Sequence, residues 1–256
     1  TNKDSSWNAS IEKFLRFYTK IEKENETDIE IISAKLKSIA CYENKEMKKY
    51  IEDVRLPYLK ELMRPIATTE ETLFRRGNFN GSWDQIICDA LIDVKGAQIS
   101  LSPGFRWGTS VMPNQTITFD DLMTQTAMTY PETYARDIKG SEIKLILEDV
   151  ADNLFNEDPF LQQGGDMVRT GGISYKIDPK AKIGERITNI VLSKTGEKLD
   201  ANKSYKVAGW STVGAQSEGE PIWETVETYL KNMKHISKIK IDTPDIVGVK
   251  GNPGII

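Results

Sequence analysis

The chain has 256 residues, of which 39% are hydrophobic and 28% are charged, and its formal net charge is −4. This composition is ordinary for a globular protein, and the acidic balance predicts no basic surface for nucleic acid. No apolar run approaches the roughly 20 residues of a membrane span, so we expect neither nucleic acid nor a membrane as a partner.

The first 43 residues are expected to lead into the part of the chain that follows. Residues 1–30 are polar and charged, whereas residues 31–40 alternate enough to predict a strand. Because the chain begins at Thr1 and not at Met, we expect a processed form or a fragment.

A long helix is predicted over residues 44–63, where apolar residues recur at helical spacing. Pro57 lies inside this pattern and should kink or interrupt the helix, because proline has no N–H to donate. A second helix is predicted over residues 82–93. Asn80-Gly81 is a turn signal before it, and Ser82 is the predicted N-cap.

The strand predicted over residues 97–101 leads into the sequence SPGFRWG, which places Arg106 just after a Pro-Gly turn. Loops at strand ends often carry binding residues. A guanidinium is a planar fork that binds a tetrahedral oxyanion through charge-assisted hydrogen bonds. A solvated surface arginine is the alternative, since charged loop residues are usually exposed.

The remaining elements mix helices with short strands. Thr118, followed by acidic residues, predicts the start of a short helix. Further helices are predicted over residues 143–155 and 221–234. Extended segments are predicted over residues 127–130, 133–138, 173–177, 187–192 and 205–208, with a hairpin turn at Thr195-Gly196. This order predicts an α+β fold in which helices pack on a mixed sheet.

Metal ligands are scarce in the sequence. His235 is the only histidine, and no HExxH, CxxC, Walker or GxSxG sequence occurs. A hydrolytic dinuclear centre normally needs several histidine and carboxylate ligands, so we expect no metal site in this chain. Cys88 lies in an apolar run and is expected to be buried, while a disulfide with Cys41 stays open.

Several long motifs resemble the C-terminal half of the SoxB family of thiosulfohydrolases, which are relatives of the 5′-nucleotidases. They are RRGNFNGSWDQIICDAL, SPGFRWG, YPETY, LEDVADNLFN and QQGGDMVRTGG, and they follow one another within residues 33–256. The resemblance implies a 5′-nucleotidase C-terminal-domain-like fold over residues 67–256 and a linker helix over residues 44–66. It also implies that residues 1–43 are a lead-in and the end of a missing N-terminal domain.

The resemblance also implies a set of substrate-binding residues. Arg106 corresponds to the arginine of a Gly-Gly-Ile-Arg sequence that contacts substrate in the nucleotidases, and it is the first candidate to bind a sulfonate or phosphate. The other candidates are Asn78, Trp107, Tyr134, Asp166 and Arg169. Trp107 and Tyr134 are equally consistent with core packing, and Asp166 with a structural ion pair to Arg169. No catalytic residue is expected in this chain.

For the whole protein, the resemblance implies a two-domain hydrolase of the periplasm. It would release sulfate from a cysteine S-thiosulfonate on the SoxYZ carrier complex. A dimanganese centre would lie in the missing N-terminal metallophosphoesterase-like domain, and this chain would hold no cofactor. The chain would therefore be the substrate-recognition half, inactive by itself.

Two alternatives stay open at this point. The first is a fragment of a nucleotidase-type phosphoester hydrolase, which an aromatic pair that stacks on a base would favour. Residues 209–220 lack the Gly-Gly-Asp-Gly-Phe-like motif that supplies one of these aromatics in the nucleotidases, which argues against nucleotide binding. The second alternative is a non-catalytic module that binds the carrier.

Overall fold

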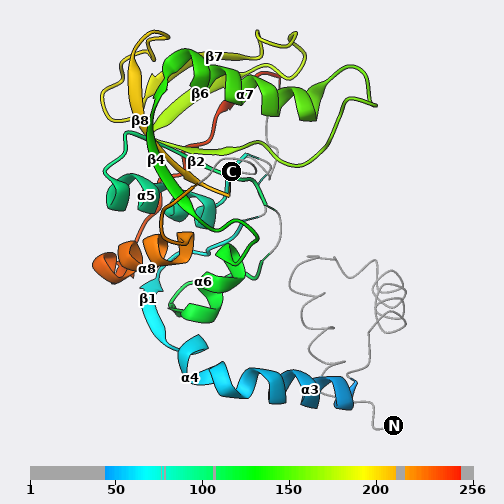
Figure 1. The fold of residues 1–256 in the computed structure, drawn as a ribbon, viewed down its shortest axis with the longest axis vertical. Coiled ribbons are helices and arrows are strands. Elements are labelled where there is room, and N and C mark those ends of the chain that lie inside the picture. The colour runs from blue at the N-terminus through cyan, green and yellow to red at the C-terminus, as the bar shows by residue number, and fades with distance from the viewer. Residues whose placement is uncertain (1–43, 76, 78, 106–107, 212–216, 249–256) are drawn as a thin grey trace, which may run out of the picture. The chain divides into compact units, whose positions relative to one another are not determined.

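The structure is a computed structural model that describes residues 44–248, apart from residues 76, 78, 106–107 and 212–216 (Figure 1). The predicted strand over residues 31–40 and the residue Cys41 lie outside this part. The chain divides into two units, Thr1–Tyr58 and Leu59–Ile256. None of the described helices is long and apolar enough to cross a membrane.

The predicted long helix is present in three pieces. α3 (Lys45–Arg55) is followed by the 3₁₀ turn η2 (Leu56–Tyr58), and α4 (Leu59–Leu62) begins the second unit. Pro57 lies in the 3₁₀ turn, so the predicted interruption is confirmed. β1 (Pro65–Thr69) follows shortly afterwards, so the predicted boundary between residues 66 and 67 falls inside this strand.

A four-stranded mixed sheet forms the centre of the second unit, with the strand order β4-β8-β2-β5. β8 runs parallel to β2 and antiparallel to β4, and β5 runs antiparallel to β2. The four strands of this sheet are β2 (Ile99–Ser102), β4 (Thr133–Lys139), β5 (Arg169–Gly171) and β8 (Ser204–Trp210). Helices pack on both faces of this sheet, so the predicted α+β fold is confirmed.

Side chains of β8 alternate between two apolar cores, as the period of a strand requires. Tyr205 and Val207 enter a core with α7 (Gly140–Phe155) and the hairpin of β6 (Ile173–Ile177) and β7 (Ile187–Leu192). Ala208 and Trp210 enter the other core, which α5 (Ser82–Lys95) and α8 (Ile222–Met233) complete. The sheet therefore lies between two layers (Figure 1).

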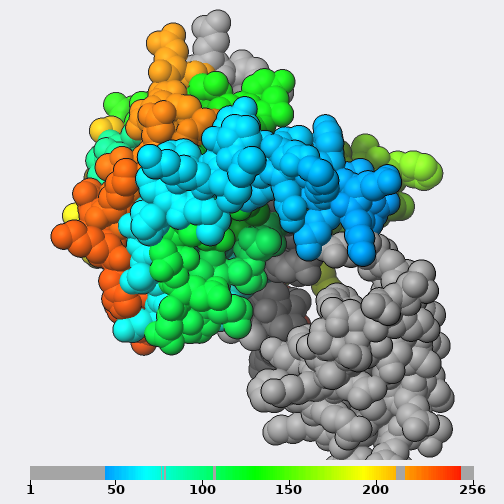
Figure 2. All heavy atoms as spheres, turned by 90° about the horizontal axis from the view of Figure 1, so that it is seen from below, coloured from blue at the N-terminus to red at the C-terminus, as the bar shows by residue number. Residues whose placement is uncertain are grey.

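Two smaller sheets extend the unit. β1 pairs with β3 (Gln115–Thr118) on one side and with β9 (His235–Ile236) on the other. β6 pairs with β7 and with β10 (Asp245–Ile246). α6 (Phe119–Thr126) follows β3 directly. Figure 2 shows β1 in cyan, α6 in green and α8 in orange, side by side on one face of the second unit.

Two local predictions need correction, and one strand was missed. Ser82 is the first residue of α5 and not its N-cap, because its hydroxyl donates to Thr72 O at 2.8 Å and accepts the Phe74 N–H at 2.9 Å. Residues 127–130 form no strand. The strand β5 was not predicted. The predicted burial of Cys88 is confirmed, and the cysteine is free.

Candidate functional site

Four connections meet at one edge of the central sheet. The parallel strands β2 and β8 end there at Ser102 and Trp210. Arg169, which begins β5, lies opposite Ser102, and Thr133, which begins β4, lies opposite Trp210. The loop that carries Arg106 therefore shares this edge with the segments before β4 and β5 and after β8. Loops gathered on a rigid scaffold are the usual location of binding residues, so this edge is the candidate site.

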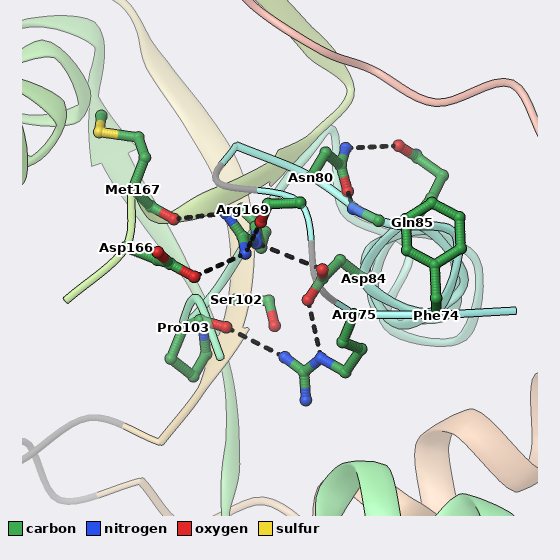
Figure 3. A network of polar contacts seen from close by, with 12 residues as sticks. Phe74, Arg75, Asn80, Asp84, Gln85, Ser102, Pro103, Asp166, Met167 and Arg169 are labelled. Atoms are coloured by element: carbon green, nitrogen blue, oxygen red, sulfur yellow. Dashed lines mark hydrogen bonds and ion pairs between the residues drawn. The ribbon is translucent and has the colours of Figure 1, made fainter. Parts of the chain in front are cut away.

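A buried ionic network lies beneath these loops (Figure 3). Arg75 Nε donates to Asp84 Oδ1 at 2.8 Å, and Arg169 Nε lies 3.3 Å from Asp84 Oδ2. Arg169 Nη2 also donates to Asp166 Oδ2 at 3.1 Å. No more than 4% of any of these four side chains is exposed. Two guanidinium groups thus alternate with two carboxylates, and the four formal charges cancel.

The network also binds backbone carbonyl groups from three loops and from the last turn of α6. Arg75 donates to Gln125 O at 2.6 Å and to Pro103 O at 3.1 Å. Arg169 donates to Gly77 O at 2.5 Å and to Met167 O at 3.2 Å. Hydrogen bonds from charged groups stabilise by about 1.5–3 kcal/mol. Three motifs that are far apart in the sequence, RRGNFNG, SPGFRWG and QQGGDMVR, are therefore fixed to one another.

Desolvation controls the electrostatics of the network. Burial raises the pKa of Asp84, although the neighbouring Arg75 and Arg169 oppose this effect, and burial lowers the pKa of Arg75. Such a network adds little stability over an apolar core, but removing one partner leaves an uncompensated buried charge. Its main consequence is a fixed geometry for the loops.

Both ends of the loop that carries Arg106 are anchored. At its start, the centroid of the Phe105 ring lies 4.9 Å from the Arg75 guanidinium and 6.1 Å from the centroid of the Trp210 ring. At its end, Gln125 Nε2 donates to Thr109 O at 2.9 Å. Gly108 has φ +114°, and a Cβ there would lie 2.8 Å from Gln125 Nε2, so this position requires glycine.

The predicted site residues fall into two groups. Asn78, Arg106 and Trp107 lie outside the described residues, although the network holds their described neighbours Gly77 and Phe105. Their predicted contacts with substrate stay predictions. Tyr134, Asp166 and Arg169 are described.

Arg169 and Asp166 form the ion pair that the sequence left open as an alternative. The Arg169 side chain is fully buried, so its position supports a positioning role beneath the loops. Tyr134 lies on β4 with its ring against Gly209 of β8, and the Arg136 guanidinium lies 4.8 Å from the ring centroid. Burial raises the pKa of Tyr134, so its phenol stays protonated at neutral pH.

Sequence reasoning missed Arg75 and Asp84 as parts of the site. Asp84 follows Trp83 in the first turn of α5. An acidic residue at this position is usually explained by its favourable interaction with the helix dipole. The available signal was its position, because Asp84 lies between Trp83 and the apolar run Ile86-Ile87-Cys88. A charge within an apolar segment needs a buried partner.

The chain belongs to the family of 5′-nucleotidase C-terminal domains, because the model of that family matches residues 65–226. Within this class, it resembles the sulfate thiohydrolase SoxB of Thermus thermophilus, with 30% identity and a TM-score of 0.75. That match covers 84% of this chain and 41% of SoxB. The predicted membership and the resemblance to the SoxB C-terminal domain are confirmed.

Two nucleotidases share the fold at lower identity. A 5′-nucleotidase precursor of Thermus thermophilus is 19% identical with a TM-score of 0.64, and the match covers 79% of this chain and 43% of that one. The NAD nucleotidase NadN of Haemophilus influenzae is 15% identical with a TM-score of 0.59, covering 87% and 45%. A search of curated proteins gives no match. The chain spans less than half the length of these solved structures.

Proposed function

We propose that this chain is the substrate-recognition half of a SoxB-like thiosulfohydrolase that acts in the periplasm. The full protein releases sulfate from a cysteine S-thiosulfonate on the SoxYZ carrier. The observation that carries this proposal is the match to SoxB, whose 30% identity exceeds the 19% and 15% of the two nucleotidases. The solved structures that the chain resembles are a sulfate thiohydrolase and nucleotidases, and they support a hydrolase activity for the full protein.

In this proposal, Arg106 holds the oxygens of the terminal sulfonate through its planar guanidinium. Asn78 donates to the same anion, and Trp107 and Tyr134 wall the site. The supporting observation is that the network of Arg75, Asp84, Arg169 and Asp166 joins the loops on which the two predicted anion ligands lie. A fixed loop avoids the reorganisation that a flexible one would need at the moment of reaction.

The proposed dimanganese centre belongs to an N-terminal metallophosphoesterase-like domain and not to this chain. Among the residues that the structure describes, no group of three or more His, Cys, Asp or Glu side chains is arranged to hold a metal ion. The chain's own residues bind and orient the substrate.

The alternative is a nucleotidase-type phosphoester hydrolase, which the shared fold of the two nucleotidases supports. One experiment separates the two functions. The full-length protein is assayed side by side for sulfate release from a peptide cysteine S-thiosulfonate and for phosphate release from AMP. We expect kcat/KM for the thiosulfonate to be at least 100-fold higher. Faster release of phosphate would assign the protein to the nucleotidases and refute the proposal.

A further inference from the structure

A cavity of about 600 Å³ opens on the second unit, away from the candidate site. It lies at the opposite edge of the central sheet, since Ala97 and Gln98 precede β2 there and Gly172 follows β5. The cavity is enclosed by α5, α8, the turn after β7 and residues 236–242. This volume is within the range of about 300–1,000 Å³ that small-molecule sites occupy.

One side of the cavity is polar. It is formed by Gln85, Asp89 and Asp242, which are held in place by hydrogen bonds. Gln85 Nε2 donates to Asp89 Oδ1 at 2.8 Å, and Gln85 Oε1 accepts the Asp242 N–H at 2.8 Å. The Gly172 N–H donates to Asp242 Oδ2 at 3.4 Å. Gln85 is itself 1% exposed. Two carboxylates are therefore fixed beside the cavity before any ligand enters.

The other walls are mainly apolar and include one aromatic ring. Burial raises the pKa of Tyr229 to about 12, so the phenol is neutral and its ring keeps an electron-rich face. The apolar residues that line the cavity are Ile86, Ile92, Ala97, Leu192, Met233, Ile236 and Ile239. A ligand that fits these walls has an apolar body.

The charges favour a cation at the polar side. Burial and, to a smaller extent, the negative charge of Asp242 raise the pKa of Asp89 to about 6, although the hydrogen bond from Gln85 opposes this rise. Near neutral pH, two carboxylates thus repel each other in partly desolvated surroundings, and a cation between them would relieve this repulsion. Lys194, Lys238 and Lys240 also line the cavity, and Lys240 opposes the rise that burial causes in the pKa of Asp242. All three lysines are exposed, so water screens their charges.

We propose that this cavity binds a small organic ammonium ligand. Its nitrogen lies between the carboxylates of Asp89 and Asp242, and its apolar body packs against Tyr229 and the isoleucine side chains. An inorganic divalent cation fits less well, because it prefers six or more oxygen ligands. Among the described residues, no third His, Cys, Asp or Glu side chain joins such a group.

The test uses three probes of similar size that differ in charge: phenethylammonium, 2-phenylethanol and 3-phenylpropionate. Each is titrated into the 256-residue chain at pH 7.5, and binding is measured by calorimetry. We expect saturable binding of phenethylammonium, on the order of tenfold tighter than of the neutral alcohol. Tighter binding of the carboxylate would show that the lysines dominate, and no saturable binding of the ammonium would also overturn the proposal.

Two variants complete the test. Asp89→Asn keeps the shape of the side chain and removes its charge, so we expect phenethylammonium to bind about tenfold more weakly while 2-phenylethanol is unaffected. Asp137→Asn on β4 is the control, because Asp137 is exposed and does not line the cavity. It should change the affinity less than twofold. Equal effects of the two variants would refute the site, and thermal melts show that both remain folded.

Discussion

The carboxylate of Asp84 is the single group on which the geometry of the candidate site depends most. It contacts both Arg75 and Arg169, and these arginines hold carbonyl groups of three loops. Burying a carboxylate between two guanidinium groups costs desolvation free energy. The main contribution of Asp84 is therefore to fix the positions of the loops and not to add stability.

Replacing Asp84 with asparagine should leave two buried arginines with one fewer compensating charge. We expect a loss of about 3–5 kcal/mol in the free energy of unfolding, which corresponds to a fall in Tm of roughly 10 °C. Asp137→Asn, at an exposed position of β4, is the control and should cost less than about 0.5 kcal/mol. Thermal melts that move equally for the two variants would contradict the assigned role.

Asp89 gives a stability prediction that depends on pH. Its pKa in the folded chain is raised from 3.8 to about 6, so the folded state binds the proton more tightly than the unfolded state does. The stability from protonated Asp89 is present near pH 4 and is lost as the pH rises through 6, because the ionised group is then partly buried. At pH 8 this costs on the order of 3 kcal/mol.

Asp89→Asn removes that ionisation. The variant should melt several degrees higher than the unmodified chain at pH 8 and at nearly the same temperature at pH 4. Melting curves at the two pH values check this. A lower Tm at pH 8, or the same rise at both values, would show that ionisation of Asp89 is not what limits stability there.

At the scale of elements, the periodic segments were predictable from the sequence, whereas the buried ionic network around Asp84 was not. α5, α7 and α8 carry apolar stripes at helical spacing, and the structure places them where that spacing predicted. β5 has only three residues and begins with a buried arginine, so its sequence shows no strand pattern. Arg75, Asp84 and Arg169 meet only through the tertiary fold, and a single sequence does not report such contacts.

The start of α6 offers a test of local structure. The Thr118 hydroxyl accepts the Asp121 N–H at 3.2 Å, and Asp121 Oδ2 accepts the Thr118 N–H at 2.8 Å, which completes a capping box. Thr118→Ala should therefore reduce the free energy of unfolding by about 1 kcal/mol. Thr116→Ala, on the same strand but exposed, should cost less. Urea denaturation measures both, and a smaller loss for Thr118→Ala would argue against the cap.

At the scale of the whole molecule, the chain corresponds to one part of the solved structures that it resembles. Its match covers 41% of the SoxB structure, and the family model describes a C-terminal domain. The fold class and the family were predictable from the order of the motifs. The contact of Arg106 with substrate stays a prediction, because Arg106 lies outside the described residues.

Turnover of Arg106 variants in the full-length protein tests the central claim most directly. Arg106→Ala should lower sulfate release from a cysteine S-thiosulfonate by about 10–100-fold, because losing a charge-assisted contact costs roughly 1.5–3 kcal/mol. Arg106→Lys should recover only part of the rate, since lysine lacks the planar fork, and Arg55→Ala on α3 should leave it unchanged. All three should melt close to the unmodified protein. Unchanged turnover in Arg106→Ala, or a loss of activity matched by an equal loss of folded protein, would contradict the account.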